Sequence, residues 1–162
     1  MKNLGKIFED NWKKSIPDHM FYYRFRDSAS SYYGGNDNLR FSITNIADCL
    51  VFNGNELFLF ELKNHKGKSI PLTAIIGKKS KEKQINDLVD ASCKIRVSCY
   101  LVVFFCDVER CFALDINDLY YFLKNEDRKS IPITYFEEDG IEIPIKKLKT
   151  NYRYDLNVLI GK

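Results

Sequence analysis

The residues from Asn45 to Lys63 constrain the fold of this chain more than any other segment. Two runs rich in apolar and aromatic side chains, 45–52 and 55–63, lie on either side of the dipeptide Asn53-Gly54. Such a dipeptide is a strong indication of a β-hairpin, because a tight type I′ turn needs positive φ at both central residues. The segment therefore predicts two antiparallel strands, and at least part of them must belong to a hydrophobic core.

The predicted hairpin brings three charged side chains, Asp48, Glu61 and Lys63, onto one face of the sheet. Side chains alternate between faces along a strand, so Glu61 and Lys63 share a face. A two-residue turn places Asp48 diagonal to Glu61, about 7–8 Å away at the Cα atoms. A four-residue loop places Asp48 directly opposite Glu61, whereas an odd loop length would separate the two carboxylates.

This group of charges has two interpretations. In the first, Glu61 and Lys63 lie on a solvated face and Asp48 marks the end of a strand. In the second, the carboxylates bind Mg²⁺, because burying a charge is costly unless it is paired or coordinates a metal. The lysine would then orient or help to activate a water molecule and offset developing negative charge. The hairpin alone leaves both interpretations open.

Length and composition limit the classes of protein to consider. The chain has 162 residues, which fits one domain, and 45% of them are hydrophobic. The formal net charge of +3 permits a nucleic-acid partner without requiring one. No apolar run is long enough to cross a membrane, the first residues do not resemble a signal peptide, and the five cysteines lack metal-binding spacing. We therefore expect a cytoplasmic protein with reduced thiols.

Apolar periodicity along the rest of the chain predicts a mixed α/β fold. Besides the hairpin, we expect a helix at 3–14, a strand at 19–27, a helix at 80–92, a strand at 97–106, an antiparallel strand at 109–114, and a helix capped by Asp115 that runs to Leu123. Glu9 lies within the first helix, and Gln84 lies near the start of the second. Residues 131–145 predict at best short strands, and the pattern of 152–160 fits either a strand or a helix.

Basic residues occur in two segments near the hairpin. The expected strand at 19–27 carries Arg24 and Arg26 on one face. The segment 64–83 is rich in lysine and includes Lys66, Lys68, Lys78 and Lys79. Such cations neutralise the phosphates of a nucleic acid, although a solvated loop would have the same composition.

Two further patterns belong to connecting segments. Residues 27–38 are rich in Ser, Tyr and Gly, which indicates either a surface loop or an extended excursion that contacts a nucleic-acid junction. The tetrapeptide Lys-Ser-Ile-Pro occurs at 14–17, 68–71 and 129–132. Because its spacing is uneven, we interpret it as recurring turn chemistry rather than as a repeat architecture.

The order of several motifs resembles that of the RecU family of Holliday junction resolvases, in the PD-(D/E)XK nuclease superfamily. The motifs are Gly5-Lys6-x-Phe8-Glu9, Asp48, Glu61-Leu62-Lys63 and Lys83-Gln84-Ile85. Each is weak alone, but their order and spacing across nearly the whole chain are specific. The resemblance implies a restriction-endonuclease-like α/β core, with a central mixed β-sheet flanked by helices. It also implies a stalk-like insertion at 27–41 between the first two core strands.

The same resemblance implies a function. A single nuclease domain, 1–162, would act as a homodimer that binds four-way junction DNA in recombination and repair. It would cut two strands by metal-dependent hydrolysis with Mg²⁺ or Mn²⁺. The N-terminal extension of cellular members is absent, which leads us to expect a phage-type member.

The resemblance also assigns roles to individual residues. Asp48 and Glu61 would be metal ligands, with the backbone carbonyl of Leu62 as a third. Lys63 would be the catalytic lysine, and Glu9 and Gln84 would be supporting polar residues of the catalytic site. The DNA contacts would come from Arg24, Arg26, Lys66, Lys68, Lys78 and Lys79.

Besides the missing N-terminal extension, the chain departs from the family pattern in two places, and we consider two other functions. Ala47 replaces a threonine often found before the aspartate, and the insertion is not basic. One alternative is a non-catalytic DNA-binding protein that kept the fold; the complete Asp…Glu-x-Lys set argues against it, because a binder does not need these charges on a core hairpin. The other is a related nuclease of different specificity, which a comparison of junction with linear duplex would distinguish.

Overall fold

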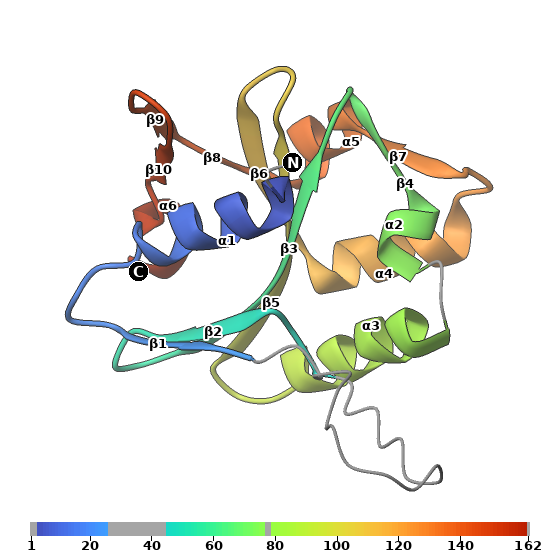
Figure 1. Ribbon diagram of the computed structural model, residues 1–162. Coiled ribbons are helices and arrows are strands. Elements are labelled where there is room, and N and C mark those ends of the chain that lie inside the picture. Colours follow the sequence, from blue (N-terminus) through green and yellow to red (C-terminus); the bar gives the residue numbers. More distant parts are fainter. Residues whose placement is uncertain (1–2, 26–44, 77–78, 162) are drawn as a thin grey trace, which may run out of the picture.

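The computed structural model describes residues 3–25, 45–76 and 79–161, without the side chains of 79–81. Its helices and strands are, in chain order, α1 (Leu4–Lys13), β1 (Phe21–Arg24), β2 (Cys49–Phe52), β3 (Leu57–His65), β4 (Ser69–Pro71), α2 (Leu72–Ile76), α3 (Lys79–Ser92), β5 (Val97–Phe105), β6 (Arg110–Asp115), α4 (Ile116–Asn125), β7 (Ser130–Pro132), α5 (Ile133–Asp139), β8 (Ile141–Ile143), β9 (Ile145–Lys147), β10 (Tyr152–Tyr154) and α6 (Asn157–Ile160) (Figure 1).

A six-stranded sheet with the order β1-β2-β3-β5-β6-β8 forms the centre of the molecule. Strands β3 and β5 run parallel, and the other neighbours are antiparallel, so the predicted mixed sheet is confirmed. Both central strands are nine residues long and are buried over much of their length. Burial on both faces explains why their sequences are almost continuously apolar.

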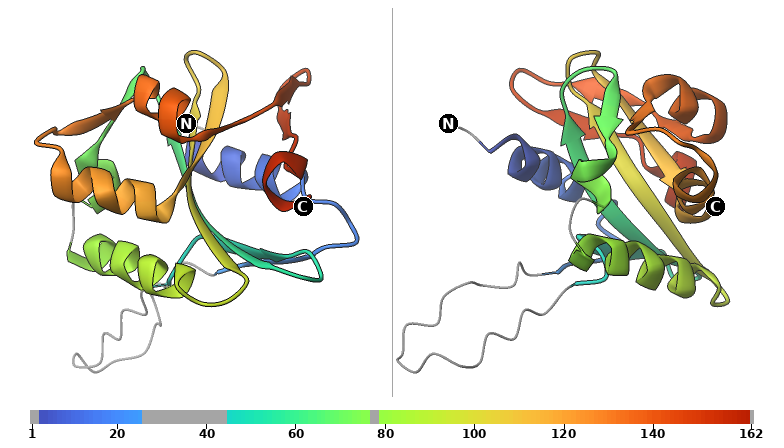
Figure 2. Two further views of the ribbon diagram at one scale, coloured as in Figure 1. Left: turned by 180° about the vertical axis from the view of Figure 1, so that it is seen from behind. Right: turned by 90° about the vertical axis from the view of Figure 1, so that its right-hand side faces the viewer.

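Helices cover both faces of this sheet, as predicted, and the alternation of side chains along β5 supplies two separate cores. Leu101 and Val103 belong to the core under α3, α4 and α5. Val102 and Phe104 belong to the core under α1 and α6. Figure 2 shows α1 and α5 on opposite sides of the sheet. A polar group on β3 is therefore directed into one of two distinct layers, according to its position in the strand.

The expected helices and strands outside the hairpin are largely present. The predictions at 3–14, 80–92, 97–106 and 109–114 correspond to α1, α3, β5 and β6. Asp115 caps α4 as predicted, because its carboxylate accepts a hydrogen bond from the N–H of Asn117 at 2.8 Å. In α1 the side chain of Asn3 accepts from the N–H groups of Gly5 and Lys6, while Phe8 and Trp12 face the core.

The interpretation of Lys-Ser-Ile-Pro as turn chemistry is wrong for two of its three occurrences. Ser-Ile-Pro at 69–71 forms β4, Ser-Ile-Pro at 130–132 forms β7, and the two strands pair antiparallel. Ile70 and Ile131 pair at the centre and are buried, and the hydroxyl of Ser69 donates to that of Ser130 at 2.8 Å. Each strand leads directly into a short helix, α2 or α5, so this small sheet joins the ends of two helical segments.

Other differences concern short elements. The segment 131–145 contains the helix α5 as well as strands, and 152–160 contains both a strand, β10, and a helix, α6. The strand expected at 19–27 is limited to Phe21–Arg24 in the described residues. The insertion predicted at 27–41 lies outside the described residues. Among the helices that the structure describes, none has the length and apolar character that a membrane span requires.

Candidate active site

The β2–β3 hairpin has a four-residue loop. Phe52 pairs with Leu57, which leaves residues 53–56 as the loop, so the two-residue turn does not form. The side chain of Asn53 explains this choice, because its Oδ1 accepts from the N–H groups of Asn55 at 2.9 Å and Glu56 at 2.8 Å. Gly54 has a φ of 97°, which glycine adopts without strain.

This loop length sets the register that places Asp48 opposite Glu61. Cys49 pairs with Phe60, and the N–H of Asp48 donates to the Phe60 carbonyl at 3.1 Å. The next position along each strand is therefore Asp48 on one side and Glu61 on the other. The predicted alternative with a four-residue loop is confirmed, and the two carboxylates share a face of the sheet.

Glu61 is buried, with 4% of its surface exposed. Its Oε1 accepts a hydrogen bond and ion pair from the ammonium of Lys63. Its Oε2 accepts from the side-chain amide of Gln84, which reaches it from α3 at 2.8 Å. The interpretation of a solvated face is therefore wrong for Glu61: its charge is removed from water and is compensated by donors from two elements.

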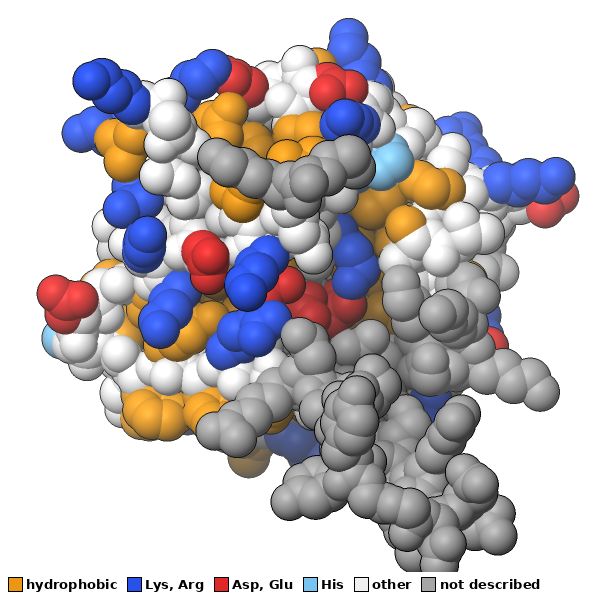
Figure 3. All heavy atoms as spheres, viewed as in Figure 1, with side chains coloured by type: hydrophobic (Ala, Val, Ile, Leu, Met, Phe, Trp, Pro, Cys, Tyr) orange, Lys and Arg blue, Asp and Glu red, His pale blue; other side chains and the backbone are white. Residues whose placement is uncertain are grey.

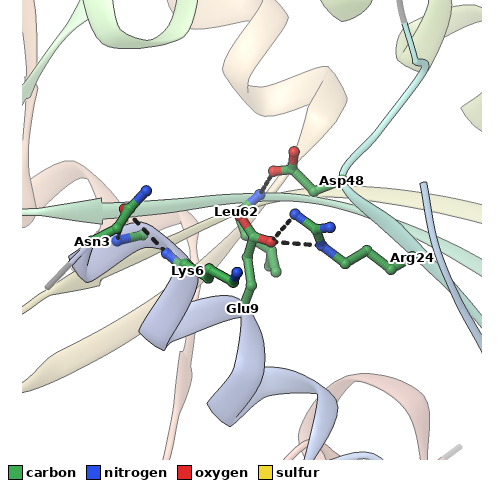
Figure 4. Close-up of polar contacts among 7 residues, drawn as sticks. Asn3, Lys6, Glu9, Arg24, Asp48 and Leu62 are labelled. Carbon is green, nitrogen blue, oxygen red and sulfur yellow. Dashed lines mark hydrogen bonds and ion pairs between the residues drawn. The ribbon is translucent and has the colours of Figure 1, made fainter. Parts of the chain in front are cut away.

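Asp48 is held at the edge of the same strand pair. Its Oδ2 accepts from the backbone N–H of Leu62 at 2.7 Å (Figure 4). The N–H and carbonyl of one residue in a strand point to the same side, and alternate residues repeat that direction. Since the Phe60 carbonyl points toward Asp48, the Leu62 carbonyl points toward that side as well. Asp48 and Glu61 thus occupy opposite positions on facing segments, and the Leu62 carbonyl is directed toward the Asp48 side of β3.

The electrostatics of Lys63 follow from these neighbours. Burial by itself would lower the pKa of the Lys63 ammonium, because it disfavours the charged form. The carboxylates of Glu61, Asp48 and, less strongly, Glu9 outweigh this effect, and the pKa of Lys63 is raised above its ordinary value. Lys63 is thus held as a cation next to the paired carboxylates.

Glu9 lies on the other face of the sheet from Glu61. It projects from α1, and its Oε2 accepts from Arg24 Nε at 2.7 Å and pairs with Arg24 Nη2 at 2.6 Å (Figure 4). Arg24 pairs with Cys49 in the sheet, which places its side chain on the face covered by α1. This ion pair was not predicted, and its two residues are fifteen positions apart with no pattern that links them.

The structure brings together only part of the predicted site. Asp48, Glu61, Lys63 and Gln84 form a connected group, and Glu9 with Arg24 lies at its border. The other predicted DNA contacts are separate: Lys66 and Lys68 are exposed in the turn after β3. Arg26 and Lys78 lie outside the described residues, and Lys79 begins α3 with its side chain undescribed.

The oxygen atoms of this group fit a hard divalent cation. Mg²⁺ is bound by carboxylates and water, and Asp48 and Glu61 provide two carboxylates from facing strands. No set of three or more His, Cys, Asp and Glu side chains in the described part of the chain could hold a metal ion. A metal here would therefore need the Leu62 carbonyl or water to complete its coordination.

Comparison with known proteins identifies the family of this chain. The family model "RecU: Recombination protein U" matches residues 48–157, which is most of the sequence and includes the β2–β3 hairpin. This chain belongs to the RecU family. A prophage relative, the "SPbeta prophage-derived uncharacterized protein YotM" of Bacillus subtilis (strain 168), is 34% identical over 174 residues, covering 99% of this chain and 86% of that protein.

The RecU-family assignment confirms the resemblance found in the sequence and supports a Holliday junction-resolving nuclease function in recombination. The family implies an endonuclease that binds junction DNA, and the prophage relative agrees with a phage-type member. Among solved structures, this RecU-family chain is similar to Hjc from Archaeoglobus fulgidus, a Holliday junction resolvase. The TM-score is 0.47 at 14% identity, covering 85% of this chain and 90% of that one.

Proposed function

We propose that this RecU-family protein is a Mg²⁺-dependent endonuclease that cuts two strands of a four-way DNA junction. The observation that supports it best is the buried Glu61 carboxylate, opposite Asp48 and in contact with Lys63 and Gln84. A protein that only binds DNA gains nothing from a charge held in its core, because burial of an ion pair seldom adds stability. A metal-dependent hydrolase needs this arrangement.

Each residue of the group has a distinct role in this proposal. Asp48, Glu61 and the Leu62 carbonyl would hold the metal, which when bound supplies a water of lowered pKa and stabilises charge on the scissile phosphate. Lys63 would position the attacking water and stabilise the negative charge that develops on the phosphate. Gln84 would fix the orientation of the Glu61 carboxylate, since it donates to Oε2. Mn²⁺ would substitute for Mg²⁺.

Arg24 and Glu9 would support this chemistry from the border of the site. Glu9 holds the guanidinium of Arg24 through two nitrogen atoms, which restricts its rotamers. An arginine held in this way is preorganised to contact a phosphate beside the cleaved bond. Lys66 and Lys68 would contact phosphates farther along the same DNA arm, together with Arg26, Lys78 and Lys79.

We also propose that the protein acts as a homodimer and works in the cytoplasm. Symmetric cleavage of two strands requires two active sites, and an exposed apolar patch supports a partner surface. Phe21 and Phe52 pair across β1 and β2, with Tyr23 on the same face, and they are 59%, 42% and 46% exposed. Clustered exposed aromatic side chains are typical of protein–protein contacts. All five cysteines are free, which suits a reducing compartment.

The dimer is tested by light scattering of wild-type protein and the variant Phe21→Glu. The wild type should have the mass of two chains, and the variant should have the mass of one, because a charge in the apolar patch opposes its burial. Tyr121→Glu is the matched control, since Tyr121 is an exposed aromatic residue on α4. A monomeric wild type, or a Phe21→Glu variant that stays dimeric, would reject this surface as the interface.

The function is tested by cleavage of a synthetic four-way junction, with wild type beside Glu61→Ala and Asp48→Ala. We expect paired symmetric cuts by the wild type in Mg²⁺, and a loss of at least about a hundredfold in rate for either variant. Junction binding should survive, because phosphate contacts supply most of the affinity. Lys124→Ala, at an exposed position on α4, should cut at the wild-type rate.

Three results would contradict this function in different ways. Binding without cutting by the wild type, in both Mg²⁺ and Mn²⁺, would identify a non-catalytic junction-binding protein. Equal cutting of linear duplex and junction would identify a related nuclease of other specificity. Normal cutting by Glu61→Ala would show that the active site lies elsewhere.

A further inference from the structure

The β9–β10 hairpin carries a basic outer face. Lys146 pairs with Arg153 across the two strands, and Lys149 is exposed in the turn that joins them. Tyr154, the neighbour of Arg153, is buried in the core under α1. Because successive side chains point to opposite faces of a strand, Lys146 and Arg153 are directed away from the protein.

These three cations are not neutralised by the protein. In the part of the chain that the structure describes, none of them contacts a carboxylate, and the guanidinium of Arg153 donates to the Tyr152 carbonyl at 3.0 Å. Lys147 differs, since it lies on the inner face and forms an ion pair with Glu109. Like charges directly opposite each other in a sheet destabilise it. An anion bound to the outer face of this hairpin would relieve this repulsion.

The hairpin is attached to the helix that borders the candidate active site. The N–H of Tyr154 donates to the hydroxyl of Ser15 at 3.0 Å, just after α1 ends. The ring of Tyr154 packs against Phe8 and Trp12, with centroids 5.4 and 5.8 Å apart. Since α1 also carries Glu9, one rigid element connects the hairpin with the site of proposed cleavage.

Exposed lysines on α1 continue the basic surface. Lys6 and Lys13 are exposed and are seven residues apart, so they lie two turns apart on one side of the helix. Figure 3 shows Lys and Arg side chains spread over the face that carries α1 and the β9–β10 hairpin, with acidic side chains near its centre. We call Lys146, Lys149, Arg153, Lys6 and Lys13 the basic track.

We propose that the basic track binds the phosphate backbone of a duplex arm of the junction, away from the bond that is cut. This rests on the proposed function. Exposed cations that the described carboxylates do not pair with can neutralise the phosphates of a DNA duplex, whose counterions are released on binding. Lysine and arginine contacts to the phosphate backbone hold the arm in place without reading its sequence.

The test compares two triple variants that each lose three positive charges. Lys146→Ala with Lys149→Ala and Arg153→Ala removes the hairpin part of the track. Lys94→Ala with Lys124→Ala and Lys129→Ala removes three exposed lysines from other elements. Affinity for a junction with long arms is measured over a range of salt concentrations, and Glu61→Gln is added to each protein so that the DNA stays uncut.

We expect the hairpin variant to bind the long-armed junction at least tenfold more weakly than the control variant. The slope of log affinity against log salt should become shallower by about 2–3, because each lost phosphate contact contributes about 0.9. Shortening the arms should weaken binding by the control variant and leave the hairpin variant unchanged. Cleavage at saturating protein, in the background with Glu61 intact, should be equal for both.

A single substitution shows whether a loss of affinity is caused by misfolding of the triple variant. Lys149→Glu changes only an exposed turn residue and should reproduce the loss of affinity with an unchanged melting temperature. If both triple variants bind alike while wild-type protein cuts junctions, the basic track is rejected and the proposed function stands. If the wild type neither binds nor cuts junctions, the proposed function itself fails. Tighter, track-dependent binding of an RNA duplex would replace DNA as the partner of this surface.

Discussion

At Glu61 a carboxylate occupies a place in the sheet that an apolar side chain would otherwise fill. Its neighbours on β3, Phe60 and Leu62, are buried as well. The ammonium of Lys63 and the amide of Gln84 compensate part of the free energy lost on desolvation. Since an apolar residue of similar volume would be at least as stable there, the retention of charge fits a catalytic role rather than a structural one.

Gln84 is the residue whose proposed role is easiest to separate from catalysis. Gln84→Ala removes the donor to Glu61 Oε2, and we expect the Mg²⁺ concentration for half-maximal cleavage to rise about 10- to 100-fold. The rate at saturating Mg²⁺ should fall much less if, as proposed, Gln84 orients a metal ligand and does not touch the DNA. A metal titration of junction cleavage measures both quantities.

The matched control for Gln84→Ala is the neighbouring Lys83→Ala. Lys83 is exposed and pairs with Asp87 within α3, so its removal should leave the metal titration unchanged. A Gln84→Ala variant with a normal metal requirement and a low maximal rate would show that Gln84 acts on the reacting groups directly.

The charged group was predictable in part because its members are close in sequence. Asp48, Glu61 and Lys63 lie on one hairpin. Side chains alternate between the two faces of the sheet along each strand, so an even number of loop residues is enough to bring Asp48 and Glu61 onto the same face. The pair of Glu9 and Arg24 was not predictable in this way. It joins a helix to an edge strand, and only the packing of α1 on the sheet brings the two side chains together.

At the scale of elements, the loop of the β2–β3 hairpin depends on Asn53. Its side chain accepts from two backbone N–H groups and donates to the Ile160 carbonyl at 2.9 Å, which ties the loop to the end of α6. Asn53→Ala should lower the free energy of unfolding by about 1–3 kcal/mol, because buried or partly buried groups lose their partners. Urea unfolding measures this, with the exposed Asn86→Ala on α3 as the control. Equal stability of the two variants would contradict the role of Asn53.

Several short elements were missed because their stability comes from tertiary contacts. Residues 133–139 begin with two β-branched residues, Ile133 and Thr134, which favour strands, yet they form α5. Phe136 of this helix packs on Phe105 and Phe112 of the sheet, with ring centroids 5.3 and 6.2 Å apart. Burial of these aromatic rings outweighs local propensity over so short a segment.

For the molecule as a whole, the last strand of the sheet, β8, pairs with β6, and Arg110 of β6 adds ion pairs to this contact. Its guanidinium donates to both oxygen atoms of Glu142 on β8, at 2.7 and 2.8 Å, and also pairs with Glu137 of α5. These hydrogen bonds hold the pKa of Glu142 below its ordinary value of 4.5. The pKa of Arg110 is raised well above its ordinary value, mainly by hydrogen bonds to Glu142 and Glu137.

This pKa shift predicts a dependence of stability on pH. A carboxyl whose pKa is lowered by folding stabilises the protein above its unfolded pKa and loses that contribution as the pH falls through the folded pKa. Glu142→Gln should therefore lower the melting temperature at pH 7 by about 1–3 °C, the amount expected for a partly exposed ion pair. The difference from wild type should shrink below about pH 4.5. Glu138→Gln, at an exposed position on α5, is the control, and a pH-independent difference would exclude this mechanism.

The mixed α/β class, the hairpin with its charges on one face and the family could all be inferred from the order of residues alone. The first two depend on periodicity and on residues of one hairpin, and the family depends on the order and spacing of motifs along the chain. Four features required the folded molecule: the choice of a four-residue loop, the burial of Glu61 against Gln84, the pairing of β4 with β7 and the position of the β9–β10 hairpin on α1. The last three are contacts between segments distant in sequence, and their free energy depends on which surfaces are buried together rather than on local preference. The loop combines local hydrogen bonds of Asn53 with one to the distant Ile160 carbonyl.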